Sequence, residues 1–139
     1  LLFGTSRHGF ACLHGVATCS NVSGCIAHQP IIWFPSMEEF LGMDDDPILN
    51  RNKLNQFADQ FPPSNVLMQT GYKDHRADYR AGVNNSRALV DDLYKAYKSK
   101  GQTDRFKHQL MEVAGHDGAW VPDWALDDIP VFLQEQGLV

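Results

Sequence analysis

Short apolar runs alternate along this chain with longer segments in which apolar residues recur at helical spacing. The apolar runs predict four strands, at 1–5, 25–29 with an extension through 33, 65–70 and 106–113. Helices are predicted at 7–20 and 84–100, and one or two further helices at 120–136. The helix at 84–100 is the clearest, because Leu89, Leu93 and Tyr97 recur at i, i+4 and i+8. Strands that alternate with helices predict an α/β fold, with a mostly parallel sheet and helices on both of its faces.

One segment, 34–63, interrupts this alternation. It contains several prolines and the acidic run at 44–46, and we predict short helices in it at about 37–42 and 49–60. We interpret it as an excursion over the sheet. The whole chain has 139 residues, which is enough for one domain with its own core.

Composition and charge exclude several classes of partner. The net charge of −5 argues against nucleic acid, because phosphate binding needs a basic surface. No apolar run approaches the roughly 20 residues that a membrane-spanning helix needs. The histidines show no metal-ligand spacing, and we expect neither a metal nor a cofactor. Because Leu1 already lies within a predicted strand, we also expect that further sequence precedes it.

The three cysteines are predicted to be structural. No Cys-x-x-Cys spacing occurs, and Cys12 and Cys19 lie seven residues apart on one face of the helix at 7–20. With Cys25 they are interpreted as small buried side chains. Free thiols fit a reducing compartment, which favours a cytoplasmic location.

The strongest chemical signal lies where the first strand meets its helix. Ser6 follows the apolar run 1–5 directly, with Gly4 two residues before it. A serine in such a strand-to-helix turn is typical of a nucleophile elbow, in which the tight turn exposes the hydroxyl. A second glycine is usual two residues after the serine. Here His8 occupies that position and glycine follows at Gly9.

Two further residues complete the set that a serine nucleophile needs. Asp74 comes three residues after Gly71, and His116 follows Gly115, so each lies just beyond a predicted strand. The chain order of serine, acid and histidine is that of an α/β-hydrolase catalytic triad. Each of these residues alone is also typical of an ordinary loop, a lone histidine most of all, and Asp78 is a rival for the acid.

On these motifs the chain resembles the α/β-hydrolase superfamily, and more narrowly its dienelactone-hydrolase and prolyl-oligopeptidase-like branch. The resemblance implies that residues 1–139 are the C-terminal portion of a single hydrolase domain, with a cap-like insertion at about 34–63. It implies that Ser6 is the nucleophile, Asp74 the acid and His116 the base. The backbone N–H of Arg7 would be one oxyanion donor, and the other donor would come from a loop upstream of this sequence.

The function that this resemblance implies is a serine hydrolase that cleaves a carboxylic ester through an acyl-enzyme. A serine peptidase of the prolyl-oligopeptidase type is the alternative within this class, so the expected partner is a small-molecule ester or a peptide. A second hypothesis, from another class, is a non-catalytic hydrolase-like module used for binding. It is motivated by His8 in the elbow and by the oxyanion loop that this sequence does not include.

Overall fold

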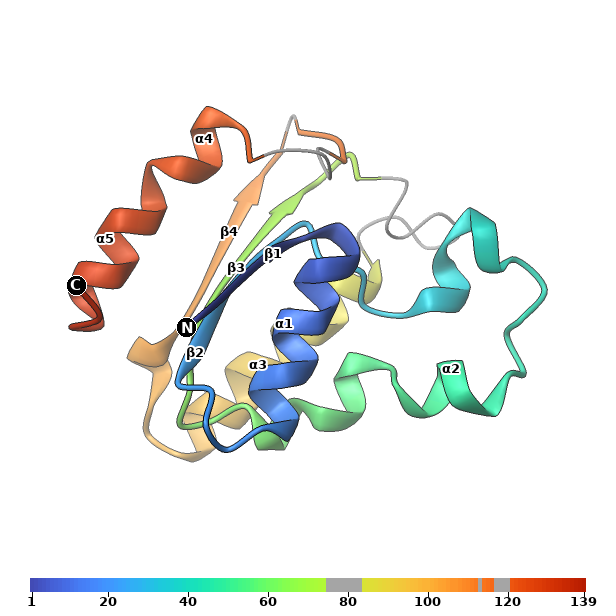
Figure 1. Ribbon diagram of the computed structural model, residues 1–139, viewed down its shortest axis with the longest axis horizontal. Coiled ribbons are helices and arrows are strands. Elements are labelled where there is room, and N and C mark those ends of the chain that lie inside the picture. Colours follow the sequence, from blue (N-terminus) through green and yellow to red (C-terminus); the bar gives the residue numbers. More distant parts are fainter. Residues whose placement is uncertain (75–83, 113, 117–120) are drawn as a thin grey trace.

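A parallel sheet of four strands forms the centre of the molecule. The computed structural model describes residues 1–74, 84–112, 114–116 and 121–139. The strands lie in the order β1-β2-β3-β4, and each pairs in parallel with the next (Figure 1). They are β1 (Leu2–Thr5), β2 (Gly24–His28), β3 (Asn65–Gly71) and β4 (Phe106–Met111). Because neighbouring strands are parallel, all their carboxyl ends lie at one edge of the sheet.

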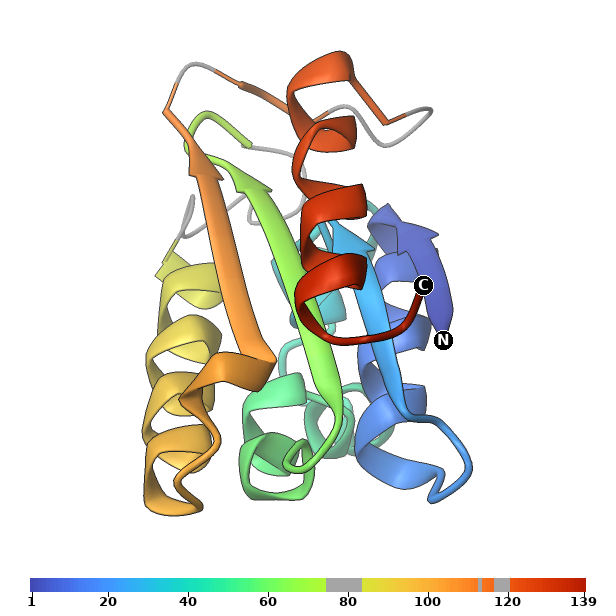
Figure 2. The same ribbon diagram turned by 90° about the vertical axis from the view of Figure 1, so that its left-hand side faces the viewer.

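Helices cover both faces of this sheet, as the sequence predicts. Helices α1 (Ser6–Thr18) and α3 (Asn84–Ser99) lie on one face, and α4 (Asp123–Leu126) and α5 (Asp128–Glu135) on the other (Figures 1 and 2). The connections contain the short α-helix α2 (Pro47–Arg51). They also contain four 3-10 helices, which are η1 (Phe34–Ser36), η2 (Glu38–Phe40), η3 (Leu54–Gln60) and η4 (Thr103–Arg105). The predicted α/β fold is therefore confirmed.

Alternate residues of β2 and β3 supply two separate cores. The larger core includes Leu13 of α1, Met68 of β3 and Leu93 of α3, none of which is exposed. The smaller core packs Leu67 of β3 against Phe132 of α5. Since successive side chains of a strand point to opposite faces, a strand that is buried on both faces reads as a continuous apolar run. This explains why β2 and β3 stand out in the sequence.

Several predicted boundaries are wrong in detail. The second strand ends at His28 and does not extend to residue 33, because Gln29 has a φ of 43°, which interrupts the extended backbone. The segment 34–63 contains mostly 3-10 turns instead of two helices. Helix α1 ends at Thr18, so Cys19 is exposed, while the other two cysteines are buried as expected.

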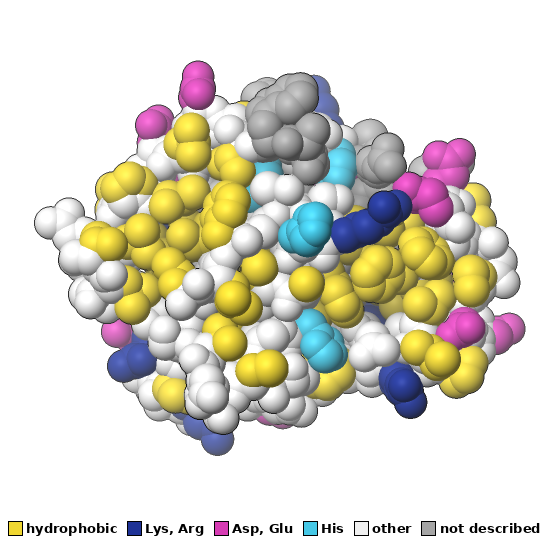
Figure 3. All heavy atoms as spheres, in the orientation of Figure 1, with side chains coloured by type: hydrophobic (Ala, Val, Ile, Leu, Met, Phe, Trp, Pro, Cys, Tyr) yellow, Lys and Arg dark blue, Asp and Glu magenta, His cyan; other side chains and the backbone are white. Residues whose placement is uncertain are grey.

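The surface has two apolar areas on the side shown in Figure 3. One lies over α4 and α5, where Leu126 and Val131 are exposed. The other lies over η2 and α2 and the turn between them, where Leu41, Met43 and Ile48 are exposed. Within the described residues, no helix is both long and apolar enough to cross a membrane.

Candidate active site

Ser6 occupies a strained turn between β1 and α1. Its φ of 53° lies in the left-handed region, which a residue with a side chain rarely adopts. The turn is also tight, because a Cβ added to Gly4 would lie 2.5 Å from the carbonyl carbon of His8. A strained, glycine-dependent turn of this kind is the geometry of a nucleophile elbow.

The departure at His8 from the usual elbow sequence has a structural explanation. The His8 side chain is exposed, so it needs no space between the helix and the sheet. Gly9 is the residue that faces a neighbouring segment, since a Cβ there would lie 3.0 Å from both Cα and Cβ of Pro30. The second close approach of this elbow therefore occurs one residue later than the pattern predicts.

The structure brings the three predicted residues of the triad together. His116 Nδ1 lies 2.8 Å from Asp74 Oδ2, and His116 Nε2 lies 3.1 Å from Ser6 Oγ. A carboxylate only accepts hydrogen bonds, so this geometry suits the tautomer in which Nδ1 carries the ring proton and Nε2 accepts from the serine hydroxyl. The side chains of Asp74 and His116 are each only 9% exposed. The rival acid Asp78 lies outside the described residues.

The fold explains why these side chains meet. Ser6 directly follows β1, and Asp74 and His116 lie in the segments that follow β3 and β4. In parallel α/β sheets, ligands bind at the edge where the carboxyl ends of the strands lie. Residues that follow three different strands therefore converge here, although Ser6 and His116 are 110 positions apart in the sequence.

Backbone contacts hold the two later loops against each other. The N–H of Lys73 donates to the carbonyl of Ala114 at 2.9 Å, one residue from Asp74 and two from His116. Gly71 allows this approach, because a Cβ there would lie 2.6 Å from the oxygen of Ala114. A contact between the two loops therefore positions Asp74 and His116 relative to each other.

Gln29 is a residue of this site that the sequence reasoning missed. Its side-chain amide donates to the carbonyl of Gly115, the residue before His116, and the glutamine is only 1% exposed. The sole signal in the sequence is a polar residue before Pro30 at the end of an apolar run, which is also typical of any strand end.

Arg7 has its side chain and its backbone in different environments. Its guanidinium forms an ion pair with Glu39 of η2 at 2.9 Å, and both side chains are well exposed. Its backbone N–H belongs to the first turn of α1, where N–H groups have no partner within the helix. A helix N-terminus of this kind favours negative charge.

The sequence has aromatic residues at Trp33, Phe34, Phe40, Trp120 and Trp124, and those that the structure describes pack in separate places. Trp33 donates its indole N–H to Asn50 at 3.0 Å, and Phe34 packs edge-on against Phe40. Trp124 packs against His28 on the other face of the sheet. Trp120 lies outside the described residues.

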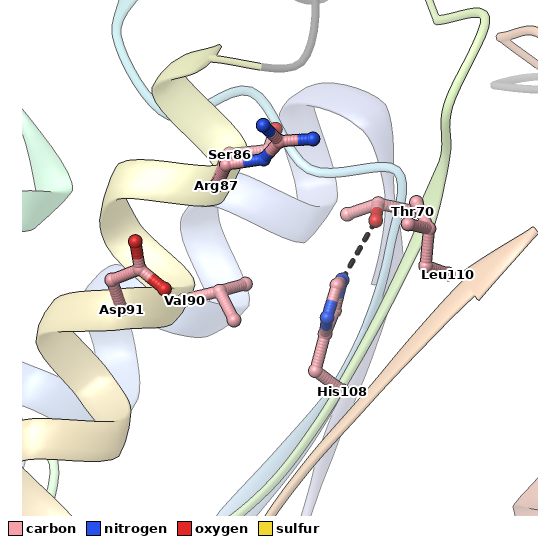
Figure 4. A pocket seen from close by; sticks show the side chains of 7 residues that line it. All are labelled: Thr70, Ser86, Arg87, Val90, Asp91, His108 and Leu110. Atoms are coloured by element: carbon pink, nitrogen blue, oxygen red, sulfur yellow. Dashed lines mark hydrogen bonds between the residues drawn. The ribbon is translucent and has the colours of Figure 1, made fainter. Parts of the chain in front are cut away.

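The structure has a cavity of about 250 Å³ between α3 and the strands β3 and β4 (Figure 4). It is lined by Thr70, Ser86, Arg87, Val90, Asp91, His108 and Leu110. His108 Nε2 lies 2.8 Å from Thr70 Oγ1, and burial lowers the pKa of this histidine. None of the triad residues lines this cavity. Among the described residues, no group of three or more histidine, cysteine or acidic side chains is arranged to hold a metal ion.

Comparisons with proteins of known structure identify this fold. No family model matches the sequence, and a search of curated proteins gives no match either. An acylaminoacyl peptidase from Pyrococcus horikoshii aligns with 95% of the chain at a TM-score of 0.67 and 14% identity. The TT1662 protein of Thermus thermophilus aligns with 96% of the chain at a TM-score of 0.70 and 18% identity. The Pyrococcus furiosus esterase Pf2001 aligns with 95% of the chain at a TM-score of 0.64 and 12% identity.

The chain spans only part of each of these proteins. It covers 22% of the peptidase, 53% of the Thermus thermophilus protein and 51% of the esterase. The shared part contains the parallel strands and the helices that surround them. The chain therefore has the α/β-hydrolase fold.

Proposed function

We propose that this chain carries the catalytic residues of a serine hydrolase. The observation that carries the proposal is the position of His116, whose two ring nitrogens lie within hydrogen-bond distance of Ser6 and Asp74. A nucleophile, its base and the group that orients the base form the arrangement by which serine is activated. Support also comes from the similar structures, which include proteins named as an esterase, a puromycin hydrolase and peptidases.

Each residue has a defined role in this proposal. Ser6 Oγ attacks the carbonyl carbon of the substrate while its proton moves to His116 Nε2. His116 then gives this proton to the leaving group, and the acyl group stays on Ser6 as an ester. Water attacks that ester by the same route and releases the acid. Asp74 fixes the tautomer of His116 and stabilises the imidazolium, and it does not take the proton.

The oxyanion of the tetrahedral intermediate needs donors placed beside Ser6. The backbone N–H of Arg7 is the donor that we assign from this chain, because it begins the helix directly after the nucleophile. One such donor is typically worth about 100- to 1000-fold in turnover. Consistent with the shares of the matched structures that the chain spans, we assign it to the C-terminal portion of a hydrolase domain. We assign 34–63 to a cap-like segment beside the elbow, which Arg7 contacts through Glu39.

The proposed substrate is a carboxylic ester, and a peptide bond is the alternative. The same acyl-enzyme chemistry serves both, and proteins named for each type of substrate are among the similar structures. Hydrolysis of p-nitrophenyl acetate and of an acylated amino-acid anilide, measured side by side, separates the two. A faster reaction of the anilide would overturn the ester assignment and favour the peptidase.

A fluorophosphonate probe tests the proposed function directly. Intact-mass analysis of the purified protein should show one adduct, and the Ser6→Ala variant should show none. The matched control is Ser20→Ala, since Ser20 is an exposed serine away from the elbow, and this variant should keep the adduct. A folded protein that forms no adduct would refute the proposal and favour the non-catalytic binding module.

A further inference from the structure

The segment that directly follows β2 contacts the backbone of the proposed nucleophile Ser6 and that of Gly115, the residue before the proposed base. From these contacts we infer that Gln29 is a positioning residue, which fixes the loop of His116 at its distance from Ser6. This inference rests on the proposed function, because it assigns Gln29 a role in the same reaction. Gln29 acts through the backbone of Gly115, to which its side-chain amide donates a hydrogen bond.

The side chain of Gln29 is held in one place. It is 1% exposed, and its amide nitrogen donates to the carbonyl of Gly115. A Cβ added to Gly71 would lie 2.9 Å from that nitrogen, so the backbone of β3 packs closely against the amide. Because this packing restrains the amide, its hydrogen bond restrains the carbonyl of Gly115 in turn.

The backbone of Gln29 supports the same interpretation. Its φ of 43° is a left-handed conformation, which glycine adopts without strain and glutamine does not. Its own N–H donates to the carbonyl of Gln69 at 2.7 Å, which anchors it to the neighbouring strand. Glycine would suit this backbone but would lack the amide, so the amide is what glutamine contributes here.

The same short segment also contacts the elbow. The N–H of Ile31 donates to the carbonyl of Ser6 at 3.2 Å, and Pro30 packs against Gly9. Three consecutive residues of one segment therefore contact the elbow on one side and the His116 loop on the other. This segment sets the separation between nucleophile and base, which is 3.1 Å from Ser6 Oγ to His116 Nε2.

The variant that tests this is Gln29→Gly, which removes the amide and relieves the backbone strain. Rate constants for fluorophosphonate labelling, and kcat and KM for p-nitrophenyl acetate, are measured beside wild type. We expect the labelling rate and kcat to fall about 10- to 100-fold, since a misplacement of 1 Å can cost about 100-fold. KM should stay close to that of wild type, because the loss falls on the transition state.

A control variant separates positioning from general destabilisation. Tyr97→Phe removes another side-chain-to-carbonyl hydrogen bond, from the Tyr97 hydroxyl to Ser64 at 2.6 Å. Ser64 precedes β3, at the opposite end of the sheet from His116. This variant should keep the wild-type labelling rate. The low-field proton resonance of the hydrogen bond between His116 and Asp74 should shift or broaden in Gln29→Gly only.

The outcomes distinguish this inference from the proposed function. A wild-type protein that is not labelled at Ser6 would refute the function itself. A labelled wild type with an equally fast Gln29→Gly variant would refute the inference alone. An equal loss in Gln29→Gly and Tyr97→Phe would also overturn it. If Gln29→Gly does not fold, the same labelling rate and kcat are measured for Gln29→Met, because methionine has a similar length and no amide donor. Wild-type values in that variant would refute the inference.

Discussion

The tightness of the turn at Ser6 predicts the effect of one added methyl group. In Gly4→Ala the new Cβ would lie 2.5 Å from the carbonyl carbon and oxygen of His8 and 2.9 Å from Cys12 Sγ. Non-bonded carbons prefer about 3.5 Å, so strand and helix would have to separate by about 1 Å. Overpacking of this kind costs about 1–3 kcal/mol of unfolding free energy. Because Ser6 lies between the two clashing residues, we also expect fluorophosphonate labelling to slow by about 100-fold.

Gly15, which lies in the helix α1 that follows the turn, provides the control. In Gly15→Ala the nearest atom to the new Cβ is Leu2 Cδ1 at 3.1 Å, the movable end of a side chain. Alanine is the better helix former by about 1 kcal/mol, so this variant should be within about that amount of wild type. Urea denaturation and labelling rates of both variants test the reasoning. Wild-type stability and labelling in Gly4→Ala would show that the turn is not tight.

Three further predictions follow from burial. Leu13→Ala should lower the unfolding free energy by about 2–5 kcal/mol in urea denaturation, because Leu13 is completely buried, and a smaller loss would mean that the site collapses. Iodoacetamide should modify exposed Cys19 before Cys12 and Cys25, because burial raises the pKa of both buried thiols, and peptide masses report the order. Burial lowers the pKa of His108 below its ordinary 6.5, so the unfolded state binds more protons and stability should fall as pH drops through about 6.5. Urea denaturation over this range should show a weaker fall in His108→Gln, and an unchanged fall would contradict the assignment.

The sheet is visible in the sequence mainly because its two central strands, β2 and β3, are buried on both faces. In the run 65–70, Val66 and Leu67 contribute to opposite cores, and the structure confirms the run as β3. The same rule explains the wrong extension of the second strand. Ile31 and Ile32 are completely buried, but they lie in an irregular segment after Gln29. An apolar pattern predicts burial, and it does not distinguish a strand from a buried turn.

The candidate site was predictable only where local sequence determines it. The position of each triad residue just after a strand can be predicted from short motifs, and parallel strands then bring their carboxyl ends to one edge. The structure places Ser6, Asp74 and His116 within hydrogen-bond distance, while their catalytic roles stay predictions. The bond from Gln29 to Gly115 spans 86 positions, and no spacing rule relates such residues. It depends on the tertiary arrangement of strands, which only the structure supplies.

Backbone strain gives a second argument for the site, independent of the triad. Among the described residues with a side chain, Ser6 and Gln29 are the two that have a positive φ. They directly follow Thr5 and His28, which pair in the register of β1 and β2, so both lie at the same level of the sheet. Such residues persist only where surrounding contacts hold them, and they cluster at active sites. Ser6 is the proposed nucleophile, and Gln29 contacts the loop of the proposed base. The strain is therefore located where a serine hydrolase needs a fixed distance between these two groups.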